Sequence, residues 1–174
     1  RYLTHKAYKY ANYISGESKA YAQAAHQINS KAPWSYTYLG VNVLEARKLI
    51  EGSKLKIHRP ADEIWLCYGG SLSNSYDFET ILNALKTIQS QEINYKMIFV
   101  GEGEKRQLIE TFAKENQLNI EVTGRLSYND YLKYLSECDI GFNSFIHGTK
   151  VVHSYKFNDY CAAGLFIFNN LNGE

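Results

Sequence analysis

The feature that most constrains the fold is a regular alternation that begins at Ile64. Short continuous apolar runs alternate with stretches in which apolar residues recur at helical spacing. The first pattern is typical of strands buried on both faces, and the second is typical of amphipathic helices. The expected strands are residues 64–68, 97–100, 120–123, 140–143 and 165–168, and the expected helices are residues 77–89, 104–117, 128–138 and 156–163.

Strands that alternate with helices in this way form a parallel sheet, because each helix carries the chain back to the edge where the next strand starts. We therefore predict an α/β fold, a Rossmann-like parallel sheet with helices on both faces. Before Ile64 the pattern is less regular. It indicates a short strand within 8–15, a helix over 19–27 capped by Ser18 or Ser15, a loop over 31–39 and a helix over 44–51.

Composition excludes several classes of protein. Hydrophobic residues make up 45% of the 174 residues, which is typical of a globular chain rather than a disordered one. The net charge of +1 provides no basic field, so we expect no nucleic acid partner. The cysteines at positions 67, 138 and 161 lack metal-site spacing and are expected to be free and buried, which is typical of a reducing compartment. No apolar run approaches the ~18 residues of a membrane span.

Glycine recurs where three of the predicted strands end. Gly69-Gly70-Ser71, Gly101-Glu102-Gly103 and Gly124-Arg125 each follow a strand. Ligands of open α/β sheets bind beyond these strand ends, and glycine lets the backbone approach a phosphate closely. Glycines also end strands for purely structural reasons, so the pattern leaves both readings open. A Walker lysine motif and a GxGxxG are absent, which removes the main support for a kinase or a nicotinamide dehydrogenase.

Five segments resemble the C-terminal domain of family 4-like glycosyltransferases, which have the GT-B architecture. They agree in order and spacing with the motifs of that family. They are Tyr68-Gly69-Gly70-Ser71-Leu72-Ser73 with Tyr76-Asp77-Phe78-Glu79-Thr80-Ile81-Leu82, Phe99-Val100-Gly101-Glu102-Gly103, Val122-Thr123-Gly124-Arg125-Leu126, Cys138-Asp139-Ile140-Gly141-Phe142, and the run from Ser154 to Gly164.

The resemblance implies a domain organisation. Residues 1–40 would be the end of an N-terminal acceptor-binding domain together with the interdomain linker. Residues 41–174 would be the C-terminal nucleotide-sugar-binding domain, half of a GT-B fold, cut before its own C-terminus. Such a piece is expected to be inactive alone.

The resemblance also implies a donor-binding site. The residues it assigns are Gly69, Gly70, Ser71, Glu102, Gly103, Arg125, Leu126, Ser154, Lys156 and Asp159. Lys156 would contact the diphosphate as a point charge, and Asp159 would accept hydrogen bonds from the ribose hydroxyls. Arg125 and Leu126 would lie beside the nucleobase, with Glu102 and Gly103 flanking the nucleotide on its other side.

Three positions depart from the family pattern. Ser71 and Tyr76 stand where many members carry Arg and Lys, and Val151 stands where many carry a Glu at the donor sugar. The sequence offers no candidate catalytic residue and no metal site.

The function that the resemblance implies is retaining transfer of a hexose from a UDP- or GDP-sugar to a glycan or lipid-linked acceptor, in polysaccharide biosynthesis. It also implies that no cofactor or metal is needed. The acceptor would be bound through the N-terminal domain, in a cytoplasmic protein that could associate peripherally with the inner face of the membrane. A nucleotide-sugar epimerase and a binding module without transferase activity remain as alternatives. A flavodoxin-like signalling domain would need an acidic cluster after the first strand, where Gly69-Gly70-Ser71 stands.

Overall fold

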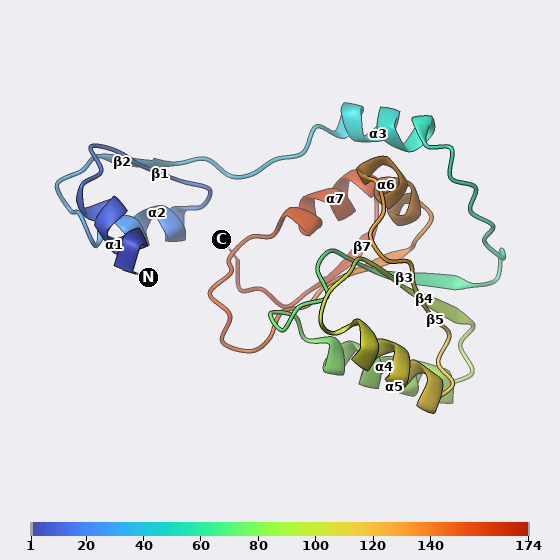
Figure 1. Ribbon diagram of the computed structural model, residues 1–174. Coiled ribbons are helices and arrows are strands. Elements are labelled where there is room, and N and C mark those ends of the chain that lie inside the picture. The colour runs from blue at the N-terminus through green and yellow to red at the C-terminus, as the bar shows by residue number, and fades with distance from the viewer. Residues whose placement is uncertain (1, 174) are drawn as a thin grey trace. The chain divides into compact units, whose positions relative to one another are not determined.

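The computed structural model describes residues 2–173 and divides into two units (Figure 1). The first unit contains the residues up to 40, residues 151–155 and those after 171. The second contains residues 41–150 and 156–171. Each unit has its own packing and is described by itself.

The first unit is small and carries little core. Its elements are α1 (Tyr2–Lys9), β1 (Ile14–Gly16), α2 (Lys19–His26) and β2 (Trp34–Tyr36), and β1 pairs with β2 in parallel. Its buried core consists of Ile14, Ala25 and Ala32. The expected cap of α2 is confirmed, since the Ser18 side chain accepts a hydrogen bond from the Tyr21 amide at 3.1 Å.

One expectation for the first unit was wrong, and one helix was not predicted. Residues 31–39 were expected to form a loop, yet they contain β2, a strand of only three residues that periodicity does not reveal. Residues 2–9 form α1, which was not predicted because none of its residues is buried and its apolar residues therefore mark no core face.

The second unit is a five-stranded parallel sheet in the order β5-β4-β3-β6-β7. The strands are β3 (Ile64–Gly69), β4 (Tyr95–Val100), β5 (Ile120–Val122), β6 (Ile140–Asn143) and β7 (Phe166–Asn169). The helices are α3 (Val43–Gly52), α4 (Phe78–Ser90), α5 (Arg106–Glu115), α6 (Tyr128–Ser136) and α7 (Tyr155–Ala163). The predicted α/β fold, a Rossmann-like parallel sheet with helices on both faces, is confirmed.

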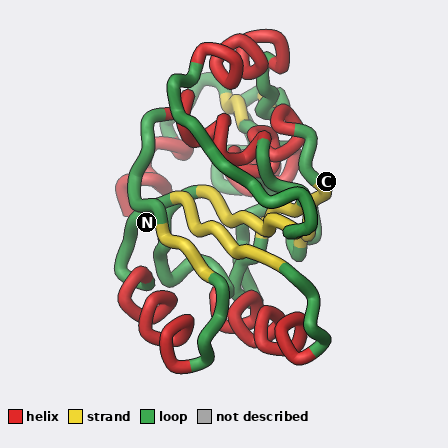
Figure 2. Tube along the Cα trace, turned by 90° about the vertical axis from the view of Figure 1, so that its right-hand side faces the viewer, coloured by secondary structure: helices red, strands yellow, loops and turns green. Residues whose placement is uncertain are grey.

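Side chains that alternate along the strands build two separate cores. On one face, Leu66 and Tyr68 of β3 pack with residues of α4 and α5. On the other, Trp65 and Cys67 pack with residues of α3, α6 and α7. The helices on the two sides of the strands are visible in Figures 1 and 2. All side chains of β3 except Ile64, and all of β4 except the half-buried Lys96, are therefore buried, which explains the continuous apolar runs of the sequence.

The cysteines follow this packing with one exception. All three are free, and Cys67 and Cys138 are buried as expected. Cys161 is exposed, so its predicted burial was wrong. It lies on α7 beside residues that face the sheet, and one position on a helix is enough to turn a side chain outward.

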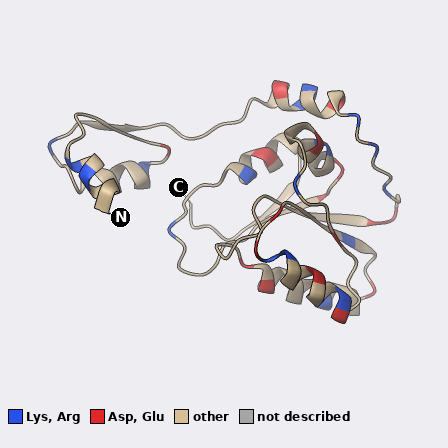
Figure 3. Ribbon diagram, in the orientation of Figure 1, with Lys and Arg blue, Asp and Glu red and all other residues tan. Residues whose placement is uncertain are grey.

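Charged residues do not gather on one face of the helices. Lys and Arg are interspersed with Asp and Glu along α4 and α5 (Figure 3). No helix within residues 2–173 is both long enough and apolar enough to cross a membrane.

Arg59 anchors the irregular segment between α3 and β3. Its guanidinium donates to the carbonyl oxygens of Glu63 and Glu137 and to Asp139 Oδ2, at 3.0, 2.7 and 2.5 Å. The same Asp139 oxygen accepts a hydrogen bond from the Trp65 amide at 2.8 Å. These contacts join the segment to the start of β3 and the end of α6.

Replacing Arg59 should therefore destabilise the second unit. Arg59→Ala removes charge-assisted hydrogen bonds and leaves the Trp65 amide as the donor to Asp139, so we expect a loss of about 1–3 kcal/mol in the free energy of unfolding. Urea denaturation followed by circular dichroism measures the change. Lys56→Ala is the matched control, because Lys56 is exposed on the same segment. Equal stabilities of the two variants would contradict the anchoring role.

Candidate functional site

The strand order creates a switch point between β3 and β6. The connection after β3 runs to α4 on one face, whereas the connection after β6 runs to α7 on the other. The loops therefore diverge at the carboxyl ends of these neighbouring strands. In open α/β sheets this divergence opens a crevice where ligands bind.

Tyr160 anchors helix α7 at this switch point by hydrogen bonds to both neighbouring strands. The Gly69 amide donates to the Tyr160 hydroxyl at 2.8 Å, and the hydroxyl donates to the Phe142 carbonyl oxygen at 3.1 Å. One buried side chain thus joins the end of β3 to β6. Tyr160 belongs to the motif that runs from Ser154 to Gly164, so the sequence pattern contained it without indicating this role.

The loops after β3 and β4 are joined to each other by backbone hydrogen bonds. The Gly70 amide donates to the Val100 carbonyl oxygen, and the Leu72 amide donates to the Glu102 carbonyl oxygen, both at 2.9 Å. A Cβ atom at Gly101 would collide with the Gly70 carbonyl, and one at Gly103 would collide with the Leu72 backbone. This packing alone explains both glycines, so a nucleotide is not needed to account for them.

Lys156, in the first turn of α7, is a buried lysine that is only 7% exposed. Its Nζ atom donates to the Tyr68 hydroxyl at 2.8 Å and lies 3.5 and 4.0 Å from the ring centres of Tyr76 and Tyr68. A Cβ atom at Gly70 would lie 3.7 Å from Nζ. The structure therefore brings Lys156 against Gly70, as a shared diphosphate site requires.

The aromatic surroundings change the acidity of Lys156. Within residues 2–173 no carboxylate forms an ion pair with it. Desolvation by burial lowers the pKa of Lys156 from 10.5 to about 6. The side chain is consequently a mostly neutral amine at neutral pH when the site is empty, and an anion placed beside it would favour the ammonium form.

Tyr68 connects Lys156 to the loop after β3. The Tyr68 hydroxyl accepts from Lys156 and donates to the Ser71 carbonyl oxygen at 2.8 Å. Ser71 itself is exposed. Tyr68 lies in a strand that the sequence predicts to be buried, but the sequence did not indicate this contact, because an apolar run does not reveal where a hydroxyl points.

Asp159, one turn after Lys156 on α7, is held by tyrosines of α6. The Tyr128 hydroxyl donates to Asp159 Oδ1 at 2.8 Å, and the Tyr131 hydroxyl also interacts with the carboxylate. Burial raises the pKa of Asp159, and the two hydroxyls oppose that rise. Tyr131 in turn packs on Gly69, where a Cβ atom would lie 2.7 Å from its hydroxyl oxygen. Asp159 therefore lies on the same side of the strand ends as Gly69.

The remaining predicted residues are less involved with Lys156. Glu102 is exposed and pairs with Arg106 at the start of α5. Arg125 is exposed, and Leu126 packs against the core that contains α6 and α7. Ser154 is half-buried and belongs to the segment 151–155, which is part of the first unit. Of the predicted donor-binding residues, the structure brings together Gly69, Gly70, Ser71, Lys156 and Asp159. Glu102, Leu126 and Ser154 have their main contacts elsewhere, and Arg125 is exposed.

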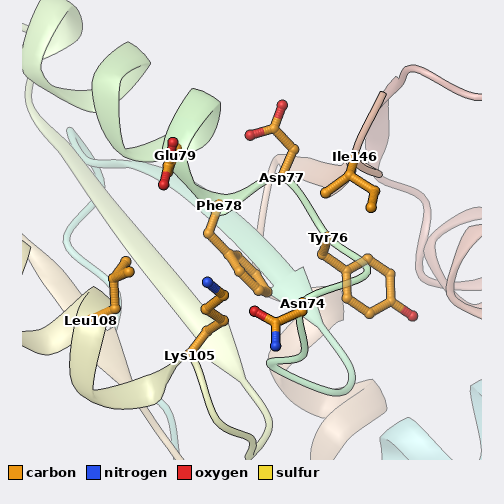
Figure 4. A pocket seen from close by; sticks show the side chains of 8 residues that line it. All are labelled: Asn74, Tyr76, Asp77, Phe78, Glu79, Lys105, Leu108 and Ile146. Atoms are coloured by element: carbon orange, nitrogen blue, oxygen red, sulfur yellow. The ribbon is translucent and has the colours of Figure 1, made fainter. Parts of the chain in front are cut away.

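A separate hollow lies beside the N-terminal ends of α4 and α5. It has a volume of about 190 Å³ and is lined by residues that include Tyr76, Phe78 and Lys105 (Figure 4). A second hollow, of about 480 Å³, lies along α5 and β5. Neither is lined by a predicted donor-binding residue, so the candidate site is defined by the contacts of Lys156 and Asp159.

Burial of Lys156 should reduce the stability of the empty protein. The folded pKa, about 6, is lower than the ordinary value of 10.5, so between these values the unfolded chain binds a proton that the folded chain does not. The free energy of unfolding therefore rises with pH between about pH 6 and 10.5. Below about pH 6 the cost of burying Lys156 reaches its full value.

Lys156→Met should remove this penalty and raise the free energy of unfolding, because a thioether packs well against aromatic rings. The gain over the native chain should be largest near pH 6 and should shrink by about 1.4 kcal/mol per pH unit toward pH 9. Urea denaturation at several pH values measures it. A variant that is less stable than the native chain throughout would show that the lysine has a structural role.

The sequence of residues 51–144 matches the family described as Glycosyl transferases group 1. A search of curated proteins finds no match. Solved structures with a similar fold include a glycosyltransferase from Rickettsia africae ESF-5, with 13% identity and a TM-score of 0.69 over 100% of this chain and 49% of that one. Another is a mutant of TarM from S. aureus in complex with Fondaparinux, alpha-GlcNAc-glycerol and UDP. Its sequence identity is 11% and its TM-score is 0.68, over 95% of this chain and 31% of that one.

A trehalose-6-phosphate structure from E. coli, bound with UDP-2-fluoro glucose, gives 11% identity and a TM-score of 0.68 over 93% of this chain and 45% of that one. The chain thus spans less than half of the length of each of these three proteins. At such identities the likeness shows the fold, which is that of GT-B glycosyltransferases. Because the family match extends over more than half of the 174 residues, the chain belongs to the group 1 glycosyl transferases.

Proposed function

We propose that this chain binds the nucleotide-sugar donor, a UDP- or GDP-hexose, of a retaining family 4-like glycosyltransferase. The observation that carries the proposal is Lys156, which is buried beside Gly70 at the switch point without a carboxylate partner among residues 2–173. Burying a lysine in aromatic surroundings is costly, and a diphosphate would supply the missing negative charge. In this proposal Asp159, on the next turn of the same helix, accepts hydrogen bonds from the ribose of the donor.

In this proposal the protein's own residues stabilise the leaving group. As the glycosidic bond to the diphosphate breaks, negative charge grows on the departing phosphate oxygens. Lys156 in its ammonium form and the N-terminal end of α7 would oppose that charge. Because these groups would take over the role that a metal ion has in other enzymes, we propose that the donor site needs no metal. Binding of the donor that is unchanged by EDTA is the expected result.

Residues 1–40 are proposed to be the end of an acceptor-binding domain, and residues 41–174 the C-terminal donor-binding domain. The acceptor, a glycan or a lipid-linked glycan, would contact the rest of that first domain. A cytoplasmic location with peripheral association at the inner face of the membrane accords with such an acceptor. The chain alone is proposed to bind donor without transferring it.

A binding module without transferase activity remains the second candidate. It is favoured by one specific observation: the aromatic rings of Tyr68 and Tyr76, rather than a second cation, surround Lys156. One buried lysine can hold a diphosphate yet supply less charge to a departing group than two cations would. A transfer assay on the longer protein, with radiolabelled sugar donor and membrane extract as acceptor, separates the two candidates.

Donor binding should be coupled to the uptake of a proton by Lys156. The pKa of about 6 in the empty site should rise when a pyrophosphate is near, so between about pH 6 and 8 binding draws a proton from the buffer. We expect affinity for UDP-glucose or GDP-mannose to fall as pH rises, by up to about tenfold per pH unit. A sugar nucleotide is the proper probe because its esterified phosphates do not titrate near neutral pH.

Calorimetry in buffers of different ionisation enthalpy measures this proton uptake. Lys156→Met should abolish both the uptake and most of the binding. Lys150→Met is the matched control, since it removes the same charge from an exposed position. Binding that shows no dependence on buffer would remove Lys156 from the donor site.

Asp159→Ala should weaken nucleotide binding at least about tenfold, equivalent to roughly 1.4 kcal/mol, because two ribose hydroxyls lose their acceptor. Calorimetry with UDP and GDP on both proteins tests this. Glu115→Ala, which removes an exposed carboxylate from α5, should bind as the native chain does. Equal affinities of the native and Asp159→Ala proteins would exclude Asp159 from the site.

A further inference from the structure

Tyr128 is an exposed aromatic residue whose hydroxyl is already occupied. It is the first residue of α6, and half of its surface (50%) is accessible. Its hydroxyl donates to Asp159 Oδ1 at 2.8 Å. A tyrosine at this position would be expected to direct its hydroxyl to solvent, so the contact with a half-buried carboxylate requires an explanation.

The ring of Tyr128 is supported from behind. It stacks on Tyr131, with ring centres 6.0 Å apart and an angle of 25° between the planes. Tyr131 is in turn held by its close contact with Gly69 at the end of β3. The start of α6 is fixed by Ser127, whose side chain accepts a hydrogen bond from the Asp130 amide at 3.2 Å. The exposed ring is therefore held on a rigid element rather than on a mobile loop.

An exposed ring beside a carboxylate has the chemistry that recognises a nucleoside. A planar base can stack on the aromatic face, and stacking on such a ring contributes about 1–3 kcal/mol per base. The vicinal hydroxyls of a ribose can donate to the carboxylate. Both groups are at the carboxyl end of the strands, and Tyr128 lies two residues after Leu126.

The hydroxyl of Tyr128 uses the same acceptor that a ribose would use. Asp159 Oδ1 already accepts the Tyr128 hydroxyl at an ordinary hydrogen-bond distance. A ribose hydroxyl that took this oxygen would have to displace the phenol or share the oxygen with it. The ring of Tyr128 would thus favour binding of a nucleoside by stacking on its base, whereas the hydroxyl would compete with the ribose for Asp159 Oδ1.

We propose that Tyr128 is a nucleoside-recognition residue whose ring stacks with the nucleobase and whose hydroxyl occupies Asp159 in place of a ribose when the site is empty. The inference rests on the proposed function, because it needs Asp159 to be the ribose acceptor. It adds a residue that the resemblance did not assign. It also predicts that the ring of Tyr128 raises the affinity for a nucleotide and that its hydroxyl lowers it.

Two substitutions at Tyr128 separate these effects. Tyr128→Phe keeps the ring and removes the competing hydroxyl, so affinity for UDP or GDP should stay the same or increase by a few fold. Tyr128→Ala removes the ring, and affinity should fall by about tenfold or more. Phe166→Ala, which removes an exposed ring from the edge strand β7, is the matched control and should bind as the native chain does.

Calorimetry with UDP, GDP and their 2′-deoxy forms provides the readout, with circular dichroism to show that each variant is folded. Any gain in Tyr128→Phe should shrink with the deoxy nucleotides, because they compete less for Asp159. If Tyr128→Phe loses as much affinity as Tyr128→Ala, or if all variants bind alike, the inference is wrong while the proposed function stands. If the native chain binds neither UDP nor GDP, the proposed function itself fails.

Discussion

The hydrogen bonds of the Tyr160 hydroxyl are the interaction on which the arrangement of the second unit depends. They join the end of β3 to β6 at the point where the connections diverge to opposite faces of the sheet. Helix α7 is thereby held above the strand ends. Lys156 and Asp159, on the same helix, are brought to the loop after β3 and to the start of α6.

The site combines features that cost stability with features that suit an anionic ligand. A buried lysine surrounded by aromatic rings lowers the stability of the empty protein, since its proton is lost on folding. The same surroundings exclude water, which strengthens the attraction between the ammonium and a phosphate. Asp159 has a comparable arrangement with its two tyrosines. Lys156 is hydrogen-bonded to Tyr68, and Asp159 is held by Tyr128 and Tyr131, so in the proposed site a ligand would add its own contacts to these tyrosines.

Much of the fold could be predicted from the sequence because buried strands and amphipathic helices have different periods. Each predicted strand and helix after Ile64 is present, with ends that differ by a few residues. The short elements before it were harder, since β2 and α1 bury too little apolar surface to produce a pattern. For the site, the motif around Lys156 and Asp159 indicated the two residues. It could not indicate Tyr68, Tyr128 or Tyr131, because tyrosine in an apolar pattern is equally typical of a core.

The sequence by itself determined the alternation of strands and helices, the family to which the chain belongs and the identity of the charged residues near the strand ends. Local spacing contains this information, since periodicity and motifs are properties of neighbouring residues. Only the tertiary structure decided that Gly101 and Gly103 are needed for packing between loops, that Lys156 is buried against Gly70, and that tyrosine hydroxyls hold both charged groups. These contacts join residues 30 to 90 positions apart, roughly, and depend on strand order, which no local pattern specifies.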